Sequence, residues 1–150
     1  MALTQTIRTD MTAAWRAGDV RRRDTLRLVI AAFDYARIAA GHDLSDDEAV
    51  ATLQREARQR RDSIEQYSAG GRDDLVRAEQ EELDIITAYL PASLTDDELA
   101  ALVHAAILEA GASGPGDLGK VMGPVMKQVA GRAEGGRVNA LVREMLASSA

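Results

Sequence analysis

The sequence predicts an all-α protein, and three observations carry this prediction. Apolar residues recur at helical spacing through nearly the whole chain, and no segment of any length alternates as a half-buried strand does. A glycine or proline follows most of these periodic segments, where it ends a helix. Two segments begin with a capping-box sequence, at residues 45–48 and 95–98. We therefore expect about four helices, followed by a small tail of three or four.

The N-terminal part of the chain contains four periodic segments. Their expected ranges are about 4–17, 20–40, 46–69 and 73–89. Gly18 ends the first, and Asp19 is placed to cap the second by accepting from its free backbone N–H groups. The first segment has apolar residues at every fourth position: Leu3, Ile7, Met11 and Trp15. We expect these four residues to lie on one face of the helix.

The C-terminal part contains three further periodic segments. Their expected ranges are about 96–110, 117–130 and 135–147. Pro124 lies inside the second of them and lacks a backbone N–H, so we expect it to kink that helix or split it in two. The linker at residues 91–94 is the expected boundary, which gives an N-terminal domain at 1–92 and a tail module at 93–150.

The amino-acid composition limits the classes of protein to which this chain can belong. The 150 residues contain 46% hydrophobic and 28% charged side chains, no cysteine, and a net charge of −6. The missing cysteines exclude disulfides, thiolate metal sites and a thiol nucleophile. No apolar run approaches the roughly 20 residues that span a bilayer, and the first residues lack the apolar core of a signal peptide. We expect a cytoplasmic protein that does not coat nucleic acid without specificity.

The tail is locally positive on an acidic chain. From Pro115 onward, five basic residues face three acidic ones, a balance of +2, so the other 114 residues sum to −8. Candidate contacts to a polyanion are these basic residues and a neighbouring asparagine: Lys120, Lys127, Arg132, Arg137, Asn139 and Arg143. The alternative is that they are ordinary solvated charges on helix surfaces.

Several sequence blocks, in their order and spacing, resemble the GatB/YqeY family and specifically its free-standing YqeY-like members. In the N-terminal part they are Thr25–Leu28, Gln59–Tyr67, Gly71–Leu75 and Tyr89–Pro91. In the tail they are Gly119–Met122, Gly131–Ala133 and Val138–Val142. The resemblance covers nearly the whole chain.

The resemblance implies a role close to translation. In the glutamine-dependent amidotransferase that converts Glu-tRNA or Asp-tRNA, a similar tail module belongs to the B subunit and helps to hold tRNA. The carbon–nitrogen ligase chemistry of that subunit lies in a separate catalytic domain, which nothing in this sequence resembles. We therefore expect a non-catalytic accessory protein that binds tRNA or a tRNA-bearing, amidotransferase-related complex. An amidotransferase-related component is a further alternative.

The N-terminal helices offer a second hypothesis, a protein–protein adaptor. Charged residues that are candidates for a partner-binding face are Arg27, Arg58, Arg61, Glu65 and Arg72. The competing interpretation is a solvent face with i,i+4 salt bridges, or a polar seam between helices. No nucleophile, phosphate-binding loop or metal-ligand cluster is recognisable, so we expect no catalytic centre, cofactor or metal.

Overall fold

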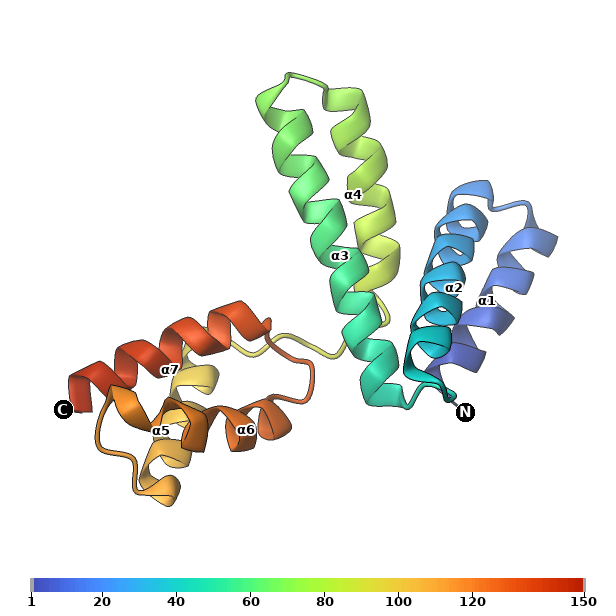
Figure 1. The fold of residues 1–150 in the computed structure, drawn as a ribbon. Helices are drawn as coiled ribbons and strands as arrows, with labels where there is room; N and C mark the ends of the chain where they lie inside the picture. The colour runs from blue at the N-terminus through green and yellow to red at the C-terminus, as the bar shows by residue number, and fades with distance from the viewer. Residues whose placement is uncertain (1, 150) are drawn as a thin grey trace. The chain divides into compact units, whose positions relative to one another are not determined.

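The computed structural model describes residues 2–149, and these residues form α-helices and one 3₁₀ turn without a β-strand. The predicted all-α class is confirmed. The elements are α1 (Leu3–Ala17), α2 (Val20–Ala40), α3 (Asp46–Ala69), α4 (Asp73–Thr87), α5 (Asp96–Ala110), η1 (Pro115–Asp117), α6 (Leu118–Val129) and α7 (Gly135–Ser149). The chain divides into two compact units, Met1–Leu90 and Pro91–Ala150 (Figure 1).

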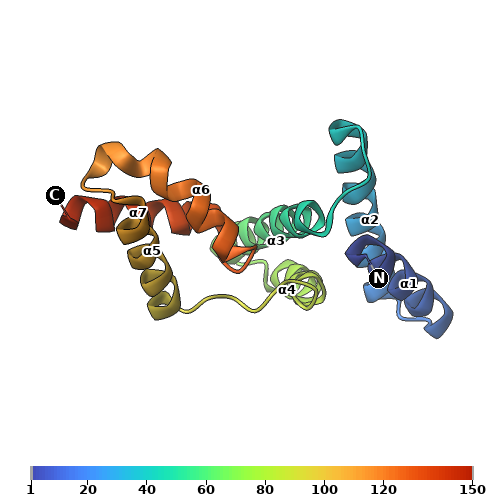
Figure 2. The same cartoon turned by 90° about the horizontal axis from the view of Figure 1, so that it is seen from below.

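The first unit consists of two helical hairpins. Helix α1 pairs with α2, and α3 pairs with α4, which lies beside it in both views (Figures 1 and 2). The core between the hairpins contains buried residues from all four helices: Ile7, Leu26, Val29, Phe33, Ala49, Leu53, Ala57, Leu83 and Ile86. One aromatic ring, that of Phe33, lies fully inside this core, so aliphatic packing holds the hairpins together.

The second unit packs α5, α6 and α7 around an aliphatic core. Its largest buried side chains come from all three helices: Leu99, Val103, Ile107, Val121, Val125, Val129, Val138, Val142 and Leu146. The turn η1 leads into α6, and Asp117 accepts the Ser113 N–H at 2.9 Å across this turn. This hydrogen bond, with the neighbouring Lys120 ammonium, lowers the pKa of the Asp117 carboxyl.

Both capping boxes predicted from the sequence are confirmed. Ser45 Oγ accepts the Glu48 N–H at 3.2 Å, and Glu48 Oε2 accepts the Ser45 N–H at 2.8 Å. Thr95 and Glu98 repeat this exchange at the start of α5. The backbone bond to Ser45 is the main cause of the lowered Glu48 pKa. Each box satisfies N–H groups that have no partner inside the helix.

The four residues expected on one face of the first helix are not buried alike: Ile7 is fully buried, whereas the Trp15 side chain is 60% exposed. A step of four residues turns about 40° beyond a full helical turn, so three such steps move Trp15 well away from the core side of Leu3. Ala14 lies seven positions after Ile7, which brings it back to the same face, and it is 4% exposed.

Pro124 does not split its helix, because α6 continues through it from Leu118 to Val129. The missing proline N–H leaves the carbonyl of Lys120, four residues earlier, without its helical donor. Both residues are exposed, so water can satisfy this carbonyl at small cost. The fourth helix also ends earlier than expected, at Thr87.

Candidate nucleic-acid interface

The two lysines of the chain lie on one face of α6. They are seven positions apart in a continuous helix, which leaves about 20° between them around the axis. Lys120 Nζ lies 3.4 Å from Asp117 Oδ1, so a carboxylate partly compensates its charge. Lys127 is exposed and makes no ion pair with the described residues. The face therefore presents one compensated and one uncompensated ammonium group.

The Arg132 guanidinium caps the C-terminal end of α6. Its Nε donates to the Val129 carbonyl at 3.1 Å, and its Nη2 donates to the Gln128 carbonyl at 2.7 Å. The chain turns here through Ala130 and Gly131, with φ angles of 49° and 82°. A cation at a helix C-terminus satisfies the last carbonyls and opposes the negative end of the helix dipole. Arg132 is thus engaged by the fold.

Arg137 joins the beginning of α7 to the beginning of α5. Its Nη1 donates to the Leu94 carbonyl at 3.1 Å, and its Nη2 donates to Asp96 Oδ1. The Leu94 N–H in turn donates to the Arg132 carbonyl at 2.8 Å. Leu94 is 7% exposed, so both of its backbone polar groups find partners in the turn that follows α6 and in α7. Arg137 thus holds the entry of the second unit in place.

Asn139 and Arg143 lie one turn apart on α7. Arg143 Nε donates to Asn139 Oδ1 at 2.7 Å, and Arg143 is exposed. The half-buried Asn139 therefore orients an exposed cation. Among the candidate tail residues, three exposed cations remain available for an external anion: Lys120, Lys127 and Arg143.

The candidate partner-binding residues of the first unit are all exposed, on α2, on α3 and before α4: Arg27, Arg58, Arg61, Glu65 and Arg72. Arg72 donates to both carboxylate oxygens of Asp74, each at 3.2 Å. This pair raises the pKa of Arg72 and lowers that of Asp74.

Sequence reasoning missed a buried cation on α3. Arg60 is 7% exposed and forms ion pairs with Glu56 on its own helix and with Glu82 on α4, the second at 3.5 Å. The available signal was its spacing, because Leu53, Ala57 and Arg60 follow the i, i+4, i+7 pattern of the apolar stripe.

A second polar cluster joins α1 and α2 to the chain that follows α4. The Tyr89 hydroxyl donates to Asp10 Oδ2 and accepts from Arg22 Nη2 at 2.7 Å, and the Arg22 guanidinium lies 5.7 Å from the ring centroid. Burial, followed by the hydrogen bond to Asp10, raises the pKa of Tyr89 to about 12. Tyr89 belongs to a block quoted for the resemblance, but its sequence gave no sign of these two partners.

Residues 2–149 hold no group of three or more side chains suited to a metal ion. In the same part of the chain, no helix has the length and apolar character needed to cross a membrane.

Two comparisons with known proteins identify the class to which this helical chain belongs. Residues 4–146 match the family model described as Yqey-like protein. The chain is also 30% identical over 130 residues to "Altered inheritance of mitochondria protein 41, mitochondrial" from Pyrenophora tritici-repentis (strain Pt-1C-BFP). That alignment covers 85% of this chain and 71% of the relative. The chain belongs to the YqeY-like family.

Proposed function

We propose that the second unit binds tRNA through the exposed cations of α6 and α7. The observation that carries the proposal is the presence of two lysines on one face of a continuous α6, with the Asn139-oriented Arg143 on α7. The resemblance of this tail to the module of the amidotransferase B subunit supports tRNA as the polyanion. Phosphate and shape contacts suit a folded RNA, whose grooves present little sequence information to side chains.

The contacts divide the tail arginines into two roles. Arg132 and Arg137 use their guanidinium groups to bind carbonyls of the unit itself, so they act on binding through the fold. The lysines and Arg143 act as direct phosphate ligands. Residues 91–150 contain no Phe, Tyr or Trp, so the proposed interface does not rely on base stacking. The interface then depends on charge, and its affinity falls with salt.

The test is tRNA binding by fluorescence anisotropy at low salt. The binding variant is Lys120→Ala/Lys127→Ala/Arg143→Ala, which omits the two arginines engaged by the fold. A matched control is Arg16→Ala/Arg37→Ala/Arg77→Ala, which removes the same charge from exposed positions of the first unit. We expect the binding variant to lose about ten-fold or more in affinity and the control to lose far less, because only the first removes phosphate contacts.

Two results count against the proposal. If the full chain does not bind tRNA at low salt, the tail is not an RNA-binding module in its own right. If both variants weaken binding equally, the interaction depends on net charge alone, and α6 and α7 have no special part in it.

A further inference from the structure

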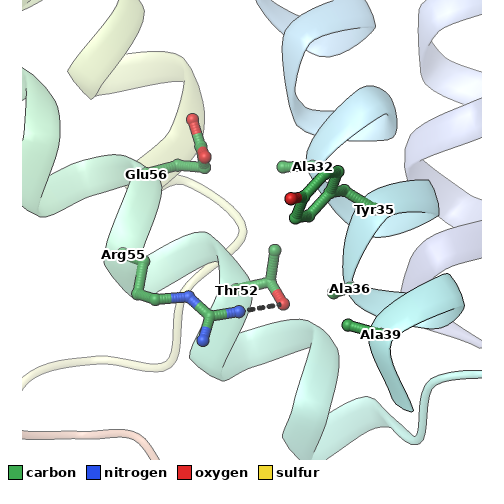
Figure 3. Close-up of a pocket in the computed structure, with 7 residues that line it drawn as sticks. All are labelled: Ala32, Tyr35, Ala36, Ala39, Thr52, Arg55 and Glu56. Carbon is green, nitrogen blue, oxygen red and sulfur yellow. Dashed lines mark hydrogen bonds between the residues drawn. The ribbon is translucent and has the colours of Figure 1, made fainter.

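A groove runs between α2 and α3 in the first unit, and its floor is apolar. It has a volume of about 410 Å³. Ala32, Tyr35, Ala36 and Ala39 supply the α2 side, and Thr52, Arg55 and Glu56 supply the α3 side (Figure 3). A second hollow of about 340 Å³ shares several of these residues and extends toward the turn between the two helices. We call this surface the α2–α3 groove.

Helix α2 also carries large apolar side chains that the fold leaves in solvent, and one of them, Tyr35, lines the groove. Leu28 is 50% exposed, Tyr35 79% and Ile38 73%. Leu28 and Tyr35 are seven positions apart and so share one line along α2, with Ile38 beside it. At 1.5 Å per residue the stripe is about 15 Å long, which equals roughly three turns of a partner helix. Scattered apolar residues are ordinary on a surface, but an aligned row beside a groove indicates an interaction site.

The groove wall on α3 carries one cation that lacks compensation. Arg55 Nη2 donates to Thr52 Oγ1 at 3.3 Å and forms no ion pair within residues 2–149. Glu56, on the same wall, is already paired with Arg60. Arg27, nine positions before Ala36 in α2, lies on the opposite side of that helix and takes no part in the groove. The uncompensated Arg55 is a local feature, since residues 1–90 carry 13 basic and 17 acidic side chains.

These features favour a partner helix as the occupant of the groove over a second copy of the chain or a bilayer surface. A second copy on a two-fold axis places the same patch against itself, so Arg55 faces a surface whose own Arg55 also lacks a partner. A bilayer surface contacts the exposed Tyr35 ring but leaves the half-buried Ala32 and Ala36 without contacts. A helix with an apolar ridge fills the floor, and a carboxylate on its flank compensates Arg55.

We propose that the α2–α3 groove binds an amphipathic helix of a partner protein, with an apolar stripe and acidic flanking residues. The alanine floor admits the ridge of the helix, Tyr35 covers it, and Arg55 pairs with a flanking carboxylate. This inference is independent of tRNA binding, because every residue that it uses lies in the first unit.

The experiment titrates a synthetic helix into the ¹⁵N-labelled full chain and follows amide chemical shifts. The probe is a peptide of about five turns with leucine and alanine on one face and glutamate on both flanks. The control peptide has lysine in place of glutamate. We expect the acidic peptide to shift amides of residues 28–39 and 52–56, with a dissociation constant of about 10–100 μM and at least ten-fold preference over the lysine peptide.

Two variants separate a docking site from general damage to the fold. Ala36→Arg fills the groove and should weaken the acidic peptide about ten-fold or more, whereas the matched Ala101→Arg, on an exposed position of α5, should not. Arg55→Glu should lower affinity for the acidic peptide and raise it for the lysine peptide. A misfolded protein does not produce such an exchange of preference.

Four outcomes overturn the proposal. The first is an absence of shifts at about 1 mM acidic peptide, and the second is equal affinity for both peptides. In the third, the protein binds no peptide but binds phosphatidylglycerol vesicles, and Tyr35→Ala abolishes this binding; the stripe is then a membrane contact. In the fourth, the protein forms a concentration-dependent dimer that excludes the peptide and that Ala36→Arg disrupts; the occupant is then a second copy.

Discussion

The substitution Arg137→Ala tests whether this tail arginine acts through the fold. It removes the donor to the Leu94 carbonyl, which belongs to a residue only 7% exposed. A hydrogen bond with one charged partner contributes about 1.5–3 kcal/mol. The accompanying ion pair with Asp96 adds little, because the Asp96 side chain is 96% exposed and screened by water. We therefore expect the second unit to lose about 2 kcal/mol of stability.

Native-state hydrogen exchange read by NMR measures this loss. The second unit lacks Trp and Tyr, so intrinsic fluorescence does not report on it. A loss of about 2 kcal/mol corresponds to about 30-fold lower protection of core amides such as Val103 and Val138. The matched control is Arg143→Ala, whose exposed bond to Asn139 should change protection less than about three-fold. If Arg137→Ala leaves the protection unchanged but abolishes tRNA binding, Arg137 does not act through the fold. It is then a direct phosphate ligand, and the reasoning is refuted.

Three further predictions concern the first unit and can be measured by urea unfolding, with Trp15 as the fluorescent reporter. Arg60→Ala leaves two glutamates without their buried cation and should cost about 3 kcal/mol; a loss below about 1 kcal/mol would show that water replaces the cation. Tyr89→Phe should cost about 1 kcal/mol at neutral pH. Because the folded pKa of Tyr89 is raised from 10.0 to about 12, its contribution is full below pH 10 and lost as pH rises through 12. The Tyr89→Phe variant should not lose this contribution to stability at alkaline pH. If the stability of both proteins falls alike as pH rises, the Tyr89 cluster with Asp10 and Arg22 is refuted. Thr25→Val should be neutral or stabilising by up to about 1 kcal/mol, because the buried Thr25 Oγ1 has no hydrogen-bond partner within residues 2–149; a clear destabilisation would indicate a bound water.

The sequence was sufficient for local features of the fold. Helix ends follow from short-range chemistry, so Gly18, Asp19 and both capping boxes could be recognised without knowledge of the packing. The all-α class followed from periodicity alone. The exposure of Trp15 did not follow from periodicity, because residues spaced four apart move gradually around the helix axis. Which side of the helix is buried depends on where the neighbouring helices lie.

The roles of residues that depend on tertiary contacts could not be predicted from the sequence. Arg137 and Arg143 look alike in sequence, but one meets the Leu94 carbonyl, 43 residues away, and the other meets Asn139 on its own helix. Tyr89 and Asp10 are 79 positions apart, so no local pattern predicts their hydrogen bond. A sequence shows which residues are charged, but tertiary packing decides which group compensates each charge.

The salt dependence of tRNA binding tests the central claim most directly. If Lys120, Lys127 and Arg143 contact phosphates, the logarithm of the binding constant should fall against the logarithm of salt concentration with a slope of about 2 to 3. Lys127→Ala removes one contact and should reduce that slope by about 0.7–0.9. A slope near zero, or a slope that Lys127→Ala leaves unchanged, would contradict the account of α6 and α7 as a phosphate-binding surface.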